Sequence, residues 1–191
     1  MKKQILITLV LFAVLASSCR EDEVVRYYEL TEAEKQLIPY TLGQTVNFID
    51  STGQTFYAVV TKDTMYWQER HYDGFPDLYA HENCRKVVLQ SDSADFNINI
   101  SINAKNKSIR IEISHLDLVF FLKYNNEGKF VSREPDAVSG QYLHNILKIG
   151  SQTYYDVVEE NRYNTRSIFY NKTYGILQVT DKGKVLFTIN N

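Results

Sequence analysis

Apolar and polar residues alternate along most of the chain after Gln44, as in strands that bury one face. In 96–103, phenylalanine and isoleucine at even positions interleave with asparagine and serine at odd ones. Residues 109–113 repeat the pattern, and the intervening 104–107 has the composition of a turn. The two segments therefore predict an antiparallel hairpin with one face in the core.

The run 116–124 is apolar on both sides, which predicts a central strand covered on both faces. Later short runs are β-branched or aromatic, with Gly150, Gly175 and Gly183 between some of them: 142–149, 153–159, 167–170, 176–180 and 185–189. About a dozen strands with no helix between them indicate an all-β fold. We expect an antiparallel sheet curled into a barrel, a half-barrel or a sandwich.

One short helix is expected before the strands. Thr31 and Glu34 have the spacing of a capping box, in which each side chain accepts a backbone N–H of the other residue. Pro39 lacks an N–H and disfavours helical geometry at the residue before it, so the helix should end by Ile38. Leu37 and Ile38 should then plug one end of the main body.

The N-terminus has the pattern of a secretory signal peptide. Two lysines precede a short apolar stretch that ends in small residues, whereas a membrane-spanning helix needs about 20 apolar residues. The sequence Ala16-Ser17-Ser18-Cys19 resembles a bacterial lipobox, which implies cleavage before Cys19 and acylation of its sulfur. We therefore divide the chain into a signal peptide (1–18), a lipidated tether (19–28) and a single β domain (29–191).

The segment Arg20-Glu21-Asp22-Glu23 resembles the export signal of surface lipoproteins of the Bacteroidetes. Further segments resemble a broad group of uncharacterised lipoproteins of the same phylum: 30–35, 37–40, 43–46, 168–172 and 174–177. The resemblance implies an outer-membrane lipoprotein with a β fold. Its domain would lie at the cell surface or, as the alternative, on the periplasmic face of the membrane. It carries no catalytic residues.

Composition excludes several classes of partner and chemistry. Lysine and arginine number 21 and aspartate and glutamate 23, so a basic face for nucleic acid is not expected. No two glycines lie nearer than eight residues, which rules out a nucleotide-binding glycine loop. There is no Gly-x-Ser-x-Gly elbow, and no residue is assigned a catalytic role. No cofactor is implied.

Histidine and cysteine do not form a metal motif. His81-Glu82 begins like a zinc-protease helix, but Arg85 stands where the second histidine belongs. His81 and Cys84, with His71, are the remaining soft ligands, and they lack a second paired set, so no metal site is assigned. With Cys19 acylated, Cys84 has no disulfide partner and is expected to be a small buried residue, the alternative being an exposed thiol.

The segment 67–83 is expected to be the longest loop, and it concentrates aromatic residues and histidines. Such side chains beside acids and amides are typical of sites for sugars or peptides. The candidate ligand-binding residues are Trp67, His71, Tyr72, Phe75, Tyr79 and His81. Alternatively, Trp67, Phe75 and Tyr79 fold inward and close one end of the barrel.

Three tripeptides resemble the O-glycosylation acceptor pattern of exported Bacteroidetes proteins, each expected near a turn. The acceptor residues would be Ser51, Thr64 and Ser93.

These observations favour a non-enzymatic, lipid-anchored envelope domain that binds a ligand or partner. The membrane would be contacted through acyl chains on Cys19, and the partner would be an unknown protein or a glycan. A carrier of a lipophilic ligand and a small envelope hydrolase are the alternatives. A packed interior would favour partner binding, an open apolar cavity would favour carriage, and acids converging with a histidine in a cleft would favour hydrolysis.

Overall fold

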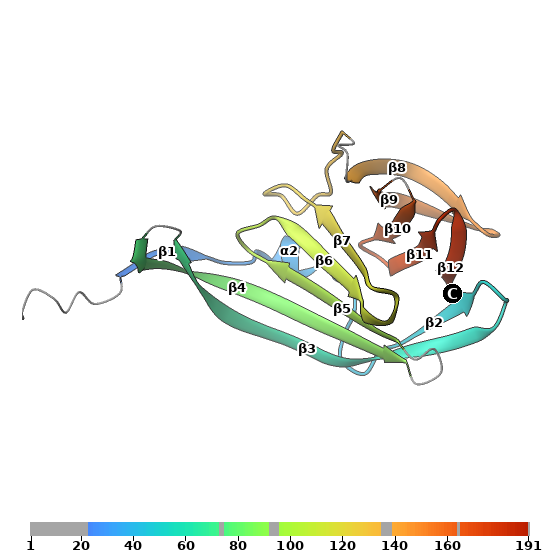
Figure 1. Cartoon of the computed structure of the whole chain (residues 1–191), viewed down its shortest axis with the longest axis horizontal. Helices are drawn as coiled ribbons and strands as arrows, with labels where there is room; N and C mark the ends of the chain where they lie inside the picture. The colour runs from blue at the N-terminus through green and yellow to red at the C-terminus, as the bar shows by residue number, and fades with distance from the viewer. Residues whose placement is uncertain (1–22, 73–74, 92–95, 135–138, 164, 191) are drawn as a thin grey trace, which may run out of the picture.

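A computed structural model describes residues 23–72, 75–91, 96–134, 139–163 and 165–190 (Figure 1). Cys19 and Ser93 therefore lie outside the described residues. The elements in chain order are β1 (Glu23–Tyr28), α2 (Glu32–Lys35), β2 (Thr45–Asp50), β3 (Thr55–Tyr72), β4 (Phe75–Ser91), β5 (Phe96–Asn103), β6 (Ser108–Ile113), the 3-10 helix η1 (Ser114–Leu116), β7 (Leu118–Lys123), β8 (Ser139–Ile149), β9 (Gln152–Arg162), β10 (Arg166–Asn171), β11 (Gly175–Asp181) and β12 (Lys184–Ile189).

The strands form one sheet that curls into a nearly closed barrel, which confirms the predicted all-β class. The strand order is β7-β6-β5-β4-β3-β2-β12-β11-β10-β9-β8, and every neighbouring pair along it is antiparallel. β1 lies off this path and pairs in parallel with β4. β7 and β8 are thus the two ends of the curled sheet, as Figure 1 shows.

Alternating side chains of the strands fill the barrel interior. Ile98, Ile100 and Ile102 of β5 and the isoleucines of β6 are fully buried, and 104–107 joins the two strands as predicted. Burying a side chain of this size contributes about 1.5–3 kcal/mol relative to leaving it exposed. The period of two in the sequence therefore identified the core face correctly.

The prediction that 116–124 is a central strand covered on both faces is wrong. β7 is an end strand, with Phe120 and Leu122 buried and Phe121 exposed on the other face. The backbone groups on its open edge are satisfied by side chains from the opposite end of the sheet. Gln141 of β8 accepts from Lys123 N (2.7 Å) and donates to Lys123 O (2.8 Å).

Two residues of β9 complete this closure. The Glu160 carboxylate accepts a hydrogen bond of 2.7 Å from Phe121 N, and the Arg162 guanidinium donates to Val119 O. The Arg162 guanidinium also lies over the Phe121 ring, 5.6 Å from its centroid. An edge strand can thus remain apolar when side chains occupy its hydrogen-bonding groups.

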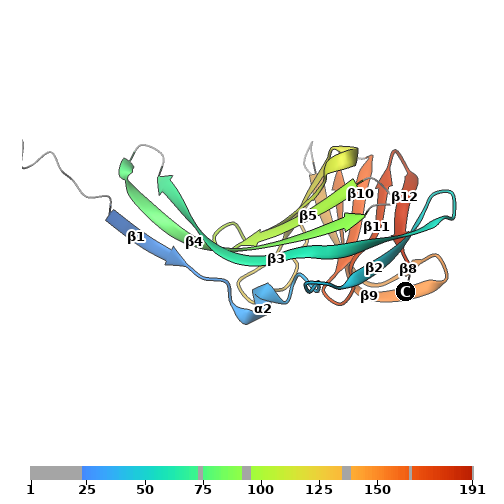
Figure 2. The same cartoon turned by 90° about the horizontal axis from the view of Figure 1, so that it is seen from below.

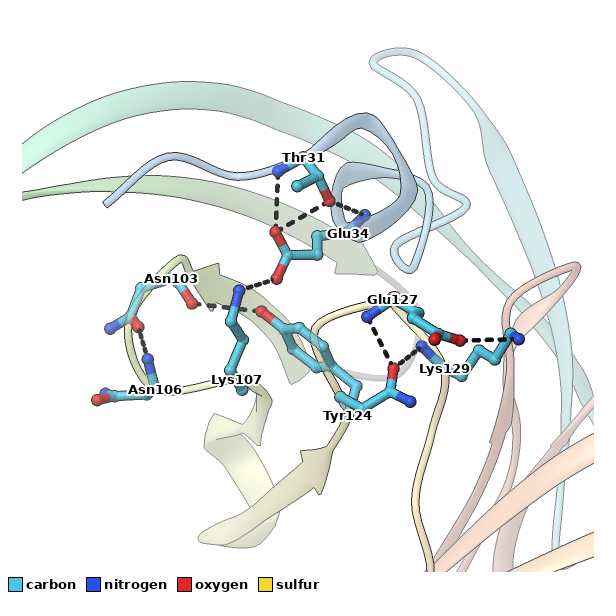
Figure 3. Close-up of polar contacts among 9 residues, drawn as sticks. Thr31, Glu34, Asn103, Asn106, Lys107, Tyr124, Glu127 and Lys129 are labelled. Atoms are coloured by element: carbon cyan, nitrogen blue, oxygen red, sulfur yellow. Dashed lines mark hydrogen bonds and ion pairs between the residues drawn. The ribbon is translucent and has the colours of Figure 1, made fainter. Parts of the chain in front are cut away.

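The short helix α2 has the predicted capping box. Glu34 N donates to the Thr31 hydroxyl (3.2 Å), and Thr31 N donates to the Glu34 carboxylate (2.8 Å) (Figure 3). The buried Glu34 carboxylate also pairs with Lys107 in the β5–β6 turn. The chain that follows the helix buries Leu37 and Ile38 in the hydrophobic core, and we call residues 37–40 the plug.

Buried hydroxyls hold this plug in place. The Tyr170 hydroxyl donates to Leu37 O (2.7 Å), and Ile176 N donates to the Tyr40 hydroxyl (2.7 Å). Burial raises the pKa of both tyrosines, so both remain neutral. The plug is therefore connected to β10 and β11 by specific hydrogen bonds as well as by apolar contact.

Candidate functional site

The most prominent feature outside the barrel is an arm made by the far parts of β3 and β4. Both views show these strands running well beyond the barrel with β1 beside them (Figures 1 and 2). The pairing of β3 with β2 covers Thr55 to Val59 and ends there, whereas the pairing of β3 with β4 continues to Tyr72. The segment 67–83, predicted to be a loop, is thus mostly hairpin strand, so that prediction is wrong.

β1 makes the arm three-stranded. Its residues pair in parallel with β4, with Tyr27 opposite His81 and Tyr28 opposite Glu82. An isolated two-stranded hairpin is marginally stable in water, and a third strand supplies the missing pairing. Residues 23–28, which were assigned to the tether, therefore belong to the folded unit.

Strand register sorts the arm residues onto two faces. Trp67 pairs with Asn83, Glu69 with His81 and His71 with Tyr79, and these residues share one face with Tyr27. Gln68, Arg70, Glu82 and Cys84 share the opposite face.

The rings on the first face contact one another. Tyr27 stacks on His81 with centroids 5.2 Å apart and meets the edge of Trp67 at 6.2 Å. Tyr79 lies 5.3 Å from His81 and 5.7 Å from His71. We call these five residues, Tyr27, Trp67, His71, Tyr79 and His81, the aromatic arm surface.

This surface is open to solvent. Tyr27 is 64% exposed, Trp67 is 48% exposed, and the neighbouring Met65 is 42% exposed. Trp67 and Tyr79 therefore do not fold inward to close the barrel. Large aromatic side chains that are exposed together are typical of interaction sites.

The structure brings together four of the six candidate ligand-binding residues: Trp67, His71, Tyr79 and His81. Tyr72 is separate from them, because its ring contacts the Lys105 ammonium at 5.0 Å. Phe75 lies in β4, but its side chain is outside the described residues. Sequence reasoning missed Tyr27, because nothing in residues 23–28 signals a parallel pairing with residues 78–82.

The opposite face of the arm is polar and supports the hairpin. Glu82 is buried, with Arg70 Nη1 at 3.7 Å and Lys105 Nζ at 3.8 Å from its Oε1. Arg26 donates to the Tyr28 hydroxyl (3.3 Å), and this bond lowers the pKa of Tyr28. The Glu82 contacts connect β3, β4 and the β5–β6 turn, and the Lys105 ammonium, 5.7 Å from the centroid of the Tyr28 ring, adds β1.

Cys84 is a free, buried residue of β4, in agreement with the expected small buried side chain. Burial raises the pKa of its thiol, and the Glu82 carboxylate raises it further. His81 and Cys84 lie on opposite faces of the arm because they are three positions apart in one strand. Among the described residues, no three histidine, cysteine or acidic side chains are placed to hold a metal ion.

Arg85 fixes the base of the arm to the plug. Its guanidinium binds both Asp63 carboxylate oxygens (2.8 and 2.9 Å) and donates to the carbonyl oxygens of Lys35, Ile38 and Tyr40 (2.7–2.9 Å). The guanidinium thus binds the carbonyl group of the last residue of α2 and two carbonyl groups of the chain that follows it.

His144 provides the only close histidine–carboxylate pair among the contacts that the structure describes. Its Nε2 lies 2.9 Å from Glu159 Oε2, beside a pocket of about 290 Å³ lined in part by Leu37, Phe130 and Leu143. The Ser167 hydroxyl donates to the other Glu159 oxygen at 3.4 Å. Because the hydroxyl meets the carboxylate and not the imidazole, this trio lacks the hydrogen bond that activates a nucleophilic serine.

Two of the three candidate O-glycosylation residues, Ser51 and Thr64, lie in described parts of the chain. Ser51 is exposed in the β2–β3 turn, where the Asp50 carboxylate accepts bonds from Thr52 and Gln54. Thr64 is exposed but lies inside β3, not near a turn as expected. No helix within the described parts of the chain is both long and apolar enough to cross a bilayer.

No protein-family model, curated protein or solved structure matches this chain.

Proposed function

We propose that this protein is a non-enzymatic, lipid-anchored domain of the bacterial envelope that binds a partner protein through the aromatic arm surface. The observation that carries the proposal is the set of mutually packed, solvent-exposed rings on a protruding arm. Tryptophan, tyrosine and methionine are enriched where protein interfaces derive most of their affinity. Edge-to-face packing also holds these rings in place before binding, which lowers the entropy cost of association.

The position of the proposed anchor agrees with this use of the arm. β1 begins four residues after Cys19, and four extended residues span about 14 Å at most. Glu23 pairs with Leu78 near the far end of the arm, and β1 runs from there toward the barrel. An acylated Cys19 would therefore hold the arm close to the membrane, so we propose a partner in or next to the outer membrane at the cell surface.

The packed interior supports partner binding over carriage of a lipophilic ligand. Fully buried side chains from β5, β6 and β7, such as Ile100, Ile111 and Phe120, occupy the centre of the barrel. The hydrolase alternative receives no support from the His144 site, because the Ser167 hydroxyl donates to the Glu159 carboxylate and not to the His144 imidazole.

The test is crosslinking in the native host with the wild type and three variants. Tyr27→Ala removes an exposed ring from the aromatic arm surface, whereas Tyr155→Ala removes an equally exposed tyrosine from β9 (64% and 63% exposed). We expect one specific crosslinked protein to be lost with Tyr27→Ala and with Trp67→Ala, and retained with Tyr155→Ala. Equal crosslinking in all four proteins would refute the role of the arm.

Anchoring is tested separately by radiolabelled palmitate. Label should enter the wild-type chain and be absent from Cys19→Ser. Failure of labelling would remove the membrane anchor from the proposal without affecting the crosslinking result.

A further inference from the structure

A second concave site lies on the other side of the arm, at its base. It is a pocket of about 310 Å³ lined by residues of the five neighbouring strands β3 to β7 and of the β5–β6 turn. Tyr66 pairs with Cys84, Cys84 with Asn103 and Asn103 with Ser108, so these four side chains share the sheet face opposite the aromatic arm surface. The pocket is therefore physically separate from the proposed protein-binding surface.

The lining offers uncharged hydrogen-bonding groups that the fold leaves unused. Within the described part of the chain, the side chains of Ser101, Asn106 and Ser108 make no hydrogen bond of their own. Asn103 accepts from Asn106 N (2.8 Å) through its oxygen, which leaves its NH₂ group available (Figure 3). The Gln68 amide oxygen accepts a long contact of 4.0 Å from the Cys84 thiol.

These groups include both donors and acceptors. Hydroxyls can do either, and each amide has a separate donor and acceptor. A ligand that matches them must itself carry several groups that donate and accept, which is the property of a polyhydroxylated ring.

Two half-exposed rings border the same pocket. Tyr66 is 41% exposed and Phe121 is 37% exposed. An aromatic ring provides a flat apolar surface against which the C–H face of a sugar ring can pack. Apolar walls together with a few directed polar groups are the usual composition of a small-molecule site.

The charge of the pocket is close to balanced. Arg110 is the one charged residue that lines it, and its guanidinium is paired with the Glu112 carboxylate at 2.8 Å. An anionic ligand would have to compete with Glu112 for that guanidinium. An uncharged ligand can accept a hydrogen bond from Arg110 without displacing the pair.

We propose that this pocket binds a single ring of an uncharged sugar, with Tyr66 or Phe121 against its C–H face and the Ser101, Asn103, Asn106 and Ser108 groups on its hydroxyls. The site does not depend on the aromatic arm surface or on the anchor.

The test is an NMR titration of the full-length chain, labelled with ¹⁵N and held in a detergent without a sugar headgroup. The probes are the methyl glycosides of glucose, galactose, mannose and N-acetylglucosamine, with glucuronate and inorganic phosphate as anionic probes. We expect at least one uncharged glycoside to cause saturable shifts of amides in 101–110, and the anions to cause none there.

Matched variants locate the effect. Ser101→Leu adds two heavy atoms and fills part of the pocket, whereas Asn99→Leu places the same leucine on the same face of β5 outside the lining. We expect Ser101→Leu to weaken glycoside affinity by about tenfold or more, and Asn99→Leu to leave it nearly unchanged. If Ser101→Leu fails to fold, Tyr66→Ala takes its place.

Three results would overturn the proposal: no saturable shift with any glycoside, shifts with the anions alone, or equal affinities in the pocket variant and Asn99→Leu. Tyr27→Ala should bind the glycoside as wild type does. Loss of protein crosslinking in that variant with sugar binding intact would show that the two sites are independent.

Discussion

The Glu160 carboxylate accepts a hydrogen bond of 2.7 Å from the backbone N–H of Phe121, across the line where the two ends of the sheet meet. Glu160 is almost completely buried, and burial raises its pKa to about 7. The Phe121 bond and the positive charges of Arg162 and Arg133 oppose this rise without cancelling it. A titratable side chain thus occupies the place of a backbone acceptor in closing the barrel.

This arrangement predicts a pH-dependent stability. A carboxyl group whose pKa is higher in the folded than in the unfolded state favours folding most when it is protonated in both states. Its contribution is therefore fully present below about pH 4.5, the ordinary value, and is lost as pH rises through about 7. The loss is on the order of 3 kcal/mol at this size of shift.

Glu160→Gln tests the pH effect directly. The glutamine oxygen can still accept from Phe121 N, but the side chain no longer ionises. The free energy of unfolding of both proteins is measured in urea at pH 5 and at pH 8. Between these two pH values the wild type should lose stability relative to the variant, because only the wild type ionises at this position. Parallel pH profiles of the two proteins would contradict the assignment to Glu160.

Gly175 should be irreplaceable, because a side chain there would occupy the position of Tyr40. Its φ is +78°, and an added Cβ would lie 2.1 Å from the Tyr40 hydroxyl oxygen. Gly43 has a similar φ of +82° but open space around it. Gly43→Ala should cost about 1 kcal/mol in free energy of unfolding, from backbone strain alone.

Gly175→Ala should cost about 3 kcal/mol or more, because the buried Tyr40 must also move and its bond to Ile176 N is disturbed. Chemical denaturation of both variants measures the difference. Equal losses at the two glycines would show that the Tyr40 plug is not held as tightly as the structure indicates.

Arg85 should be the most important charged residue for stability. Arg85→Ala would leave the Asp63 carboxylate and three carbonyl groups without their partner, at a cost of about 3–5 kcal/mol. Arg85→Lys should recover only part of this loss, since an ammonium group cannot reproduce the planar, bidentate contact. Arg166→Ala, which breaks the more exposed pair with Asp181, serves as the control and should cost under about 1 kcal/mol.

The sequence contained most of the information on the barrel. Its alternating pattern identified the inward-facing residues of β5 and β6, and the Thr31–Glu34 spacing identified the capped helix. Both signals are local, since they depend on the strand period and on one helical turn. The position of β7 is not local, because Glu160 and Gln141, which cap its edge, come from strands much later in the chain.

The candidate site likewise combines features that local sequence predicts with features that depend on pairing between distant strands. The concentration of aromatic residues in 67–83 was visible in the sequence, but their arrangement depended on strand register. Tyr72 and Trp67, five residues apart, fall into different clusters, and Tyr27 joins the surface through a parallel pairing. A pattern that looks like an aromatic loop can equally be a long twisted hairpin with one aromatic face.

The two cysteines allow the folding of the arm and the proposed anchor to be tested by one thiol titration. Cys84 is buried and its thiol pKa is raised, so the native chain should react very slowly with a disulfide reagent at pH 7.5.

The chain has two cysteines, and acylation of Cys19 would remove one of them from the count of free thiols. For protein isolated from its host, we expect no fast thiol in buffer and one per chain in concentrated urea. Cys84→Ala should then show none in either condition. Two thiols in urea would contradict the anchor, whereas one fast thiol in native protein that disappears with Cys84→Ala would contradict the buried position of this residue in the arm.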